Sequence, residues 1–456
     1  MTINRRTFLQ LGTLTLLAGC TPAVSGPGTD AGSSAPGPST TTTGPTPAAP
    51  GRDLRTVPAP RFAPAPAPGG GIDGAKLDQV LAALPAYRGG ALRRVVVRPG
   101  TYRRSRSLTI PSGVHLVAGG ATFVSRVPGA QEPLVALDNV RDVIIEGGTW
   151  DGNDAKVTVI TEWKHVIRIQ NSTRVTLTGL ITQHARGDGI YIGTHTTPCR
   201  DVTVDSVTSR RNYRNGLSVT SCDGLTCTDS IFTENGATSP LAGADIEPNH
   251  ARAPIRRVRF TRCAFTDNAG RGFLVVMHPD SVELAATSIH LDQCTATGNA
   301  PGEDNSPLWA GITLIRPRGV TVTNSLLTGN NVGIAVQGRR GGDPRRLLGR
   351  GLVRLQDIDI SDSTREGLLV VNGVRALEVE RVRIFDSSRQ EDGYFSGILL
   401  ADGSNISLTD CVSSGARMFG LQASATVSKV TLRHCVLTGN EQGAMDIPKS
   451  GVKVVD

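Results

Sequence analysis

The sequence is poor in aromatic residues and has no long apolar stretch. Phe, Trp and Tyr make up 4% of its 456 residues, whereas Gly, Val, Thr, Ser and Asn are plentiful, a composition typical of many short strands and tight turns. The apolar run from Phe8 to Ala18 is too short to cross a bilayer, and no other stretch is long enough. The eight Cys residues show no zinc-site spacing among themselves or with His. The sequence therefore argues against a membrane-spanning segment and against a zinc module.

The net charge of the chain gives only weak information about its binding partners. The formal net charge of +8 favours anionic partners only weakly. No recognisable nucleic-acid-binding motif accompanies it, so we expect no nucleic-acid partner. An acidic polysaccharide is the anionic partner that suits this balance.

The first 20 residues resemble a bacterial export signal. The stretch "NRRTFLQ" is similar to a twin-arginine motif, and "LAGC", which follows a short apolar run, is similar to a lipobox. This resemblance implies that residues 1–20 are a signal peptide and that Cys20 is lipidated and becomes the mature N-terminus. The protein would then be extracytoplasmic and anchored to the bacterial membrane by lipid. The alternative is an ordinary secretory peptide, with a secreted product and an incidental cysteine.

Residues 21–70 consist mainly of Pro, Gly, Ser, Thr and Ala. Such a segment cannot bury enough apolar surface to offset its chain entropy, so we predict a disordered tether. Residues 71–456 remain for a folded domain with a large core.

One pattern recurs along this domain: a glycine, then an apolar, a variable and a second apolar residue. It appears ten times between Gly189 and Gly443, for example as "GIYI", "GLSV", "GADI" and "GFLV", at intervals of 22 to 39 residues. Runs with a period of two, such as "RDVTVDSV", lie between the repeats and indicate strands. Repeats of this length predict a solenoid in which each coil contributes short strands.

A second column runs in phase with the first. A Ser or Cys is followed five residues later by Asn, as in Ser230 and Asn235 or Cys263 and Asn268. Stacked asparagines can hydrogen-bond from coil to coil and satisfy backbone groups at a corner. Two columns in phase predict a parallel β-helix, an all-β fold.

The start of the domain supplies a cap and a resemblance. In "GAKLDQVLAAL", Leu77, Val80, Leu81 and Leu84 share one helical face, which predicts a short N-terminal helix over the first coil. The following "RRVVVRPGTYRRSRSLTIPSGVHLVAG" resembles the entry segment of right-handed β-helix proteins of the pectin-lyase-like superfamily. The resemblance covers residues 71–456 and implies a right-handed helix. It does not define a reaction, because hydrolases, lyases, epimerases and phage tailspikes share this fold.

The cysteines fit the same picture. Cys263, Cys294, Cys411 and Cys435 occupy comparable strand positions, where small buried side chains would stack. Cys199 and Cys222 fall on adjacent coils, which leaves a disulfide between them open.

Alignment of the repeats predicts which side chains share the outer face. The residues one and three after each glycine are apolar and point inward, so the residue before it and those two and four after it point outward. Asp245 and Glu247 would then be exposed neighbours, about 6–7 Å apart along one strand, and coils would stack about 4.8 Å apart. The predicted patch contains His165, Arg168, Asp188, Tyr191, Asn215, Asp245, Glu247, Arg271 and His278.

These residue types suit a carbohydrate-active enzyme. A glycoside hydrolase needs one acid to protonate the leaving oxygen and a carboxylate to activate water or attack carbon. We assign Asp245 and Glu247 as this pair, with Asp188 assisting, and expect repulsion between neighbours to keep one acid protonated. The other patch residues would contact substrate, and Trp309, in a long segment beside the patch, would stack on a sugar ring. The hydrolase needs no cofactor.

Two alternatives remain open. In a polysaccharide lyase acting on an acidic glycan, Asp188, Asp245 and Glu247 would bind Ca²⁺, and Arg271, His165 or Tyr191 would be the base. The stretch "GDGIYIG" is similar to the aspartate-bearing strand of polygalacturonases, but their double-aspartate, Gly-His-Gly and Arg-Ile-Lys elements are missing, which argues against pectin as the substrate.

The second alternative is a non-catalytic surface protein that binds glycan, with the acids and arginines forming an ion network. The sequence defines neither the sugar and linkage nor the oligomeric state.

Overall fold

The computed structural model describes residues 71–153, 161–194, 197–248, 254–277, 288–302, 306–338, 352–390 and 393–455. The chain divides into two units, Met1–Pro50 and Gly51–Asp456, and all described residues belong to the second. The predicted signal peptide, Cys20, the tether and His278 lie outside the described residues. None of the helices among the described residues is long and apolar enough to span a membrane.

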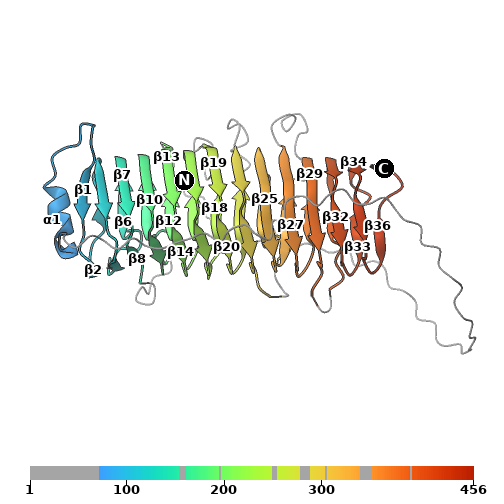
Figure 1. Cartoon of the computed structure of the whole chain (residues 1–456), viewed down its shortest axis with the longest axis horizontal. Helices are drawn as coiled ribbons and strands as arrows, with labels where there is room; N and C mark the ends of the chain where they lie inside the picture. The colour runs from blue at the N-terminus through green and yellow to red at the C-terminus, as the bar shows by residue number, and fades with distance from the viewer. Residues whose placement is uncertain are drawn as a thin grey trace, which may run out of the picture. The chain divides into compact units, whose positions relative to one another are not determined.

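The described residues form a right-handed parallel β-helix, as the repeats and the resemblance predict (Figure 1). Each coil contributes strands to a 13-stranded sheet and to a 24-stranded sheet that runs in two rows, and all pairings between coils are parallel. The 13-stranded sheet consists of β3 (Leu108–Thr109), β6 (Val135–Asp138), β9 (Ile167–Gln170), β12 (Ile190–Ile192), β15 (Leu217–Val219), β18 (Ala242–Ile246), β21 (Arg271–Val276), β24 (Ala310–Ile315), β26 (Val332–Gln337), β28 (Leu368–Val371), β30 (Ile398–Leu400), β33 (Phe419–Ala423) and β36 (Gly443–Asp446).

The larger sheet covers the other sides of the coils. One row contains β1 (Arg93–Val96), β4 (Val114–Val117), β7 (Arg141–Glu146), β10 (Thr173–Thr178), β13 (Cys199–Asp205), β16 (Cys222–Thr228), β19 (Ile255–Thr261), β22 (Ile289–Asp292), β31 (Gly403–Thr409), β34 (Ser428–Arg433) and β37 (Val452–Val455). The other contains β2 (Gly100–Arg104), β5 (Ala121–Ser125), β8 (Thr149–Asp151), β11 (Ile181–Gln183), β14 (Thr208–Arg210), β17 (Ile231–Thr233), β20 (Ala264–Thr266), β23 (Thr295–Thr297), β32 (Val412–Ser414) and β35 (Val436–Thr438). Three long strands pass through both rows: β25 (Val320–Thr328), β27 (Val353–Ser361) and β29 (Val374–Phe385).

The repeated glycine marks a close approach between coils. A Cβ on Gly216 would lie 2.6 Å from the carbonyl oxygen of Gly243, and a Cβ on Gly243 would lie 2.6 Å from that of Gly272. Real Cβ atoms do not tolerate such contacts with backbone, so a side chain at this column would push the coils apart. This steric limit explains why the repeat keeps glycine there.

The predicted asparagine ladder is present at the corner before the 13-stranded sheet. The amide nitrogen of Asn235 donates to Oδ1 of Asn268 at 3.0 Å, and the same bond runs from Asn268 to Asn299 at 2.9 Å and from Asn299 to Asn330 at 2.8 Å. Asn212, which the sequence pattern missed, extends the ladder with a 2.9 Å bond to Asn235. Each amide thereby satisfies buried polar groups that the bend of the chain leaves unpaired.

The cap and the cysteine stacks also follow the predictions. A 3-10 turn (Gly74–Lys76) leads into α1 (Leu77–Ala82), in which Leu77 and Leu81 are buried against the first coil. Cys263 and Cys294 occupy one column on adjacent coils, because the residues that follow them pair in register. Cys199 and Cys222 pair in register on β13 and β16, and both are buried free thiols.

Candidate functional site

The register of the 13-stranded sheet brings the predicted residues into two adjacent columns. Tyr191 on β12 pairs with Ser218 on β15, Ser218 with Asp245 on β18, and Asp245 with Leu274 on β21. The residues three positions earlier in each coil form the second column, which contains His165, Asp188, Asn215, Ala242 and Arg271. The predicted alignment of coils is therefore correct.

The predicted exposure is wrong. The exposed fractions are 0% for Asp188, 2% for Asp245, 3% for His165 and 4% for Tyr191, and Glu247 is half-buried. These side chains leave the coil interior, but segments at the corners of neighbouring coils close over them. The guanidinium of Arg271, for example, donates to the carbonyl oxygens of Leu308 at 3.1 Å and Pro240 at 2.9 Å. Alternation along a strand shows which face a residue takes, not whether solvent reaches that face.

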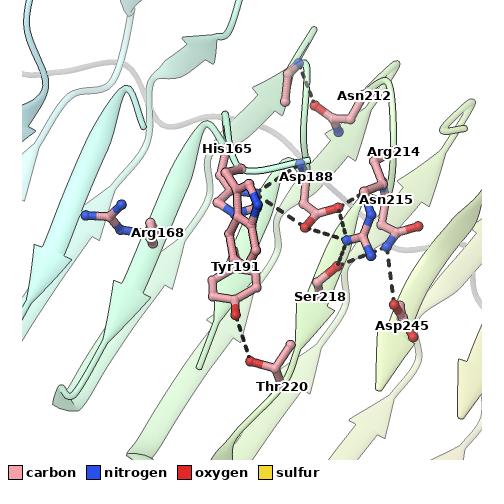
Figure 2. Close-up of polar contacts among 12 residues, drawn as sticks. His165, Arg168, Asp188, Tyr191, Asn212, Arg214, Asn215, Ser218, Thr220 and Asp245 are labelled. Carbon is pink, nitrogen blue, oxygen red and sulfur yellow. Dashed lines mark hydrogen bonds and ion pairs between the residues drawn. The ribbon is translucent and has the colours of Figure 1, made fainter. Parts of the chain in front are cut away.

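Asp188 lies at the centre of a buried polar network (Figure 2). Nη1 of Arg214 lies 3.0 Å from each of its carboxylate oxygens, and the backbone N–H of Asn215 donates to Oδ1 at 3.2 Å. Burial raises the pKa of Asp188, although Arg214 and the hydrogen bond from Ser218 act in the opposite direction. Burial also disfavours the charge on Arg214, but the surrounding carboxylates, Asp188 first, more than offset this and raise its pKa. Because both of its carboxylate oxygens accept hydrogen bonds, Asp188 is suited to holding Arg214 and Asn215 in place.

Arg214 was missed by the sequence reasoning. It stands in the turn "RNYRNG", two residues before Gly216, where neither the period of the strand nor the repeat defines a direction. The side chain is 9% exposed, so the coil corner turns it onto the sheet instead of into solvent.

His165 is held on Tyr191. The two rings stack with centroids 4.5 Å apart, and the Tyr191 hydroxyl is 2.9 Å from Oγ1 of Thr220. The Trp163 ring lies edge-on to both, at 6.3 Å from each. Trp163 is a second residue that sequence reasoning missed, because it stands in a corner segment outside the repeat.

Two contacts at Nδ1 of His165 favour opposite tautomers of its ring. The N–H of Asp188 donates to Nδ1 at 3.2 Å, which requires a lone pair on that atom, whereas Oδ2 of Asp188, 3.3 Å from the same nitrogen, favours a proton there. Burial and the nearby arginines Arg214 and Arg168 hold the pKa of His165 well below its usual value. Nε2 is a buried atom with no hydrogen-bond partner among the described residues. It can donate a hydrogen bond to a bound molecule in one tautomer and accept a proton in the other.

The carboxyl group of Asp245 has fewer hydrogen-bond partners than that of Asp188. Oδ2 accepts a long, 3.4 Å bond from the amide of Asn215, which also donates to Ser218 at 3.0 Å, and Oδ1 is buried with no partner among the described residues. Burial, followed by repulsion from Glu247, raises the pKa of Asp245 well above its usual value. The sequence reasoning foresaw the repulsion but not that burial is the larger cause. Burial and repulsion thus favour the protonated form of Asp245 over its carboxylate.

A cation accompanies this acid. Burial lowers the pKa of Arg271 to about 10, while Asp245 and Glu247 pull it upward. Arg271 is still charged at neutral pH and can stabilise the carboxylate that Asp245 becomes when it loses its proton.

Two other predicted contacts lie less centrally. Arg168 pairs in register with Tyr191, but its guanidinium is 2.6 Å from Asp138, and Figure 2 shows it apart from the Asp188 network. Trp309 is half-buried in the segment before β24, which is tied to the next coil by a 2.9 Å bond from the Asn331 amide to its carbonyl oxygen.

The carboxylates do not converge as a calcium site would require. Among the described residues, no group of three or more His, Cys, Asp and Glu side chains could hold a metal ion. Asp188 points its oxygens at Arg214, and Asn215 and Ser218 stand between it and Asp245. The proposed Ca²⁺ ligands Asp188, Asp245 and Glu247 thus do not fit the ion, and we derive no step through it.

The fold and the sequence place the chain in a family. The family described as "Right handed beta helix region" matches residues 112–284 and 166–344, and the chain belongs to it. No curated protein sequence matches the chain.

Solved structures extend the likeness of the fold. The N-terminal fragment of gene product 12 of bacteriophage Phi29 is 13% identical, with 88% of this chain and 70% of that chain covered and a TM-score of 0.54. The catalytic unit of a GH87 α-1,3-glucanase from Streptomyces thermodiastaticus is 15% identical, covers 90% and 69%, and has a TM-score of 0.44. The A-module of a mannuronan C-5 epimerase from Azotobacter vinelandii is 13% identical, covers 85% and 96%, and has a TM-score of 0.43. At these identities the likeness concerns the fold alone.

Proposed function

We propose that the protein is a polysaccharide-degrading enzyme, a glycoside hydrolase in which Asp245 is the general acid and Glu247 the second carboxylate. The observation that supports this most directly is the buried Asp245, whose raised pKa and unpartnered Oδ1 leave a proton available beside the half-buried Glu247. A carboxyl group kept neutral by its surroundings is what proton donation to a glycosidic oxygen requires.

The surrounding residues suit the charges of such a reaction. As the glycosidic bond breaks, the Asp245 proton passes to the leaving oxygen, and Arg271 and Arg214 stabilise the carboxylate left behind. Glu247, the residue that follows β18, activates water or attacks the sugar carbon. With its proton on Nε2, His165 donates to a sugar oxygen, and Trp163, half-buried and edge-on to Tyr191, provides apolar surface for a ring.

A lyase acting without a metal is the second candidate. The neutral His165 beside Tyr191, with Arg214 near, offers a base and a cation for an acidic sugar. This reaction eliminates across a carbon–carbon bond and leaves an unsaturated sugar, so the product distinguishes it from hydrolysis.

The test is turnover on a panel of neutral and acidic polysaccharides, with and without EDTA. Reducing ends without ultraviolet absorbance support hydrolysis, whereas absorbance from unsaturated ends supports the lyase and contradicts the hydrolase. Glycan binding without any product would contradict both and leave a binding protein. Asp245→Asn and Glu247→Gln are the residue-level variants, and Glu234→Gln, at an exposed ion pair with Arg211, is the matched control.

We further propose that the protein is exported and anchored through lipid on Cys20, so that its glycan lies outside the cytoplasm. The "LAGC" stretch after the twin-arginine-like motif supports this. In cells, Cys20→Ala should move the protein from the membrane fraction to the soluble fraction. Retention of that variant in the membrane would contradict the anchor.

A further inference from the structure

Cys411 and Cys435 stand one coil apart at the C-terminal end of the solenoid. Val412 and Val436, the residues that follow them, are paired Cα partners of β32 and β35. The backbone N–H of Val436 donates to the carbonyl oxygen of Cys411 at 2.8 Å, which places the two cysteine backbones side by side. Adjacent parallel strands lie about 4.8 Å apart, a separation within the Cα range of about 4.4–6.8 Å that a disulfide spans.

The Cys435 thiol already faces the coil that carries Cys411. A hydrogen bond joins the Cys411 and Cys435 side chains. Sγ of Cys435 lies 3.6 Å from the carbonyl oxygen of Leu408, which is on the coil that carries Cys411. Sγ of Cys411 lies 3.6 Å from the carbonyl oxygen of Val379, on the coil away from Cys435, so disulfide formation requires a change of the Cys411 rotamer.

Reactivity separates this pair from the other described cysteines. The hydrogen bond from Cys411 lowers the pKa of Cys435 to about 7, and Cys435 is only partly buried. Cys199 is buried, which raises its pKa to about 11, and burial likewise raises the pKa of Cys222 well above its usual value. Because the thiolate is the nucleophile in disulfide exchange, Cys435 is the cysteine prepared to react first.

We propose that Cys411 and Cys435 are an oxidisable pair that closes into a disulfide when the protein meets a thiol–disulfide oxidant. The Cys435 thiolate attacks one sulfur of the oxidant and releases its other half as a thiolate. Cys411 then loses its proton to water and attacks Sγ of Cys435, which releases the second thiolate. Two electrons pass from the cysteine pair to the oxidant, and one sulfur–sulfur bond replaces another.

The bond would fasten the last coil to the one before it. This end of the stack is loosely covered: Val436 and Val454 are each 47% exposed and Met445 is 38% exposed. Terminal repeats of solenoids need capping, since each coil is held by its neighbours alone. The N-terminal end has α1 as a cap, and the disulfide would act as the corresponding clamp at the other end. The pair lies outside the candidate site, so its oxidation is independent of the proposed reaction.

The test uses the full chain carrying Cys20→Ser, treated with oxidised glutathione and mapped by peptide mass spectrometry. We expect a Cys411–Cys435 cross-link, and iodoacetamide should label Cys435 before any other described cysteine of the reduced protein. In the oxidised protein, amides of β36 and β37 should exchange at least about tenfold more slowly than in the reduced protein.

Two variants make the outcome decisive. Cys411→Ser should stop at a glutathione adduct on Cys435, and Cys222→Ser, the control in the other stacked pair, should form the cross-link as the parent does. A lasting glutathione adduct on Cys435 in the parent, a cross-link between Cys199 and Cys222 instead, or no reaction at Cys435 would each overturn the proposal.

Discussion

The coils of β9 to β21 and the coils of β26 to β30 share one backbone and differ on their outer face. In the first region the two outer columns hold polar residues such as His165, Asp188 and Asp245. In the second region the column of Asp245 continues as Ala335, Leu369 and Leu399, and the first two are buried in a small apolar cluster. The inward glycine and apolar positions are alike in both. The fold therefore leaves the outer columns free to differ, and the candidate site occupies the coils in which those columns are polar.

The second region also contains a natural control, Glu366. It is 2% exposed and stands in the column of Asp188, and burial raises its pKa. Nε of Arg365 lies 3.4 Å from it, and the same guanidinium lies over the Phe395 ring at 4.3 Å. Its only charged partner among the described residues is thus the cation Arg365, whereas Asp245 has the second carboxylate Glu247 beside it. A buried acid alone is a feature of the fold, and the pairing of two acids is what distinguishes the candidate site.

The largest expected effect is on turnover. Asp245→Asn should reduce kcat about 10²–10⁴-fold, the usual contribution of a general acid. Glu366→Gln, which removes the charge of an equally buried carboxyl group in the other region, should leave kcat unchanged. Steady-state kinetics on the substrate found in the panel give both numbers. Equal losses in the two variants would mean that burial, not the site, explains the first loss.

The second effect is on stability. Arg214→Met leaves Asp188 buried without its cation, and we expect a loss of about 3–5 kcal/mol in the free energy of unfolding. Arg365→Met should cost less, since that side chain is 22% exposed and makes one long contact with Glu366. Denaturant unfolding measures both. Pairing Arg214→Met with Asp188→Asn should recover part of the loss, and failure to do so would show that Arg214 acts through packing.

Sequence and structure agree where steric repetition decides the geometry. The glycine column, the register that aligns Tyr191 with Asp245, and the asparagine ladder could all be predicted, because each repeats over several successive coils and has a local cause. Arg214 and Trp163 could not, since they belong to corner turns whose length varies from coil to coil. The burial of Asp245 could not be predicted for the same reason, because contacts such as that of Arg271 with Leu308 join segments 37 residues apart and follow no period.

The change of stability with pH allows a further comparison between Asp245 and Glu366. The folded pKa of Asp245 lies above its unfolded value, so between the two pKa values the folded state holds a proton that the unfolded state has released. The contribution of Asp245 to the free energy of unfolding should then be fully present below the usual carboxyl pKa of about 4 and be lost as pH rises through the folded value. Asp245→Asn should flatten this fall more than Glu366→Gln does, because the pKa of Asp245 is raised further. Unfolding curves at several pH values test this, and a steeper fall in Asp245→Asn would contradict it.

The smallest expected effects concern two hydroxyl groups in the column of Asp245, one within the candidate site and one outside it. Tyr191→Phe removes the hydroxyl that contacts Thr220, and Thr313→Val removes the hydroxyl that donates to the Leu308 carbonyl oxygen at 2.8 Å. Each loses one buried hydrogen bond, so each should cost about 0.5–1.5 kcal/mol of stability. Since Tyr191 lies under His165 and Thr313 lies two coils beyond Asp245, only Tyr191→Phe should also raise KM. If both variants raise KM equally, the substrate extends along the outer column past β21 and the polar coils do not define its limits.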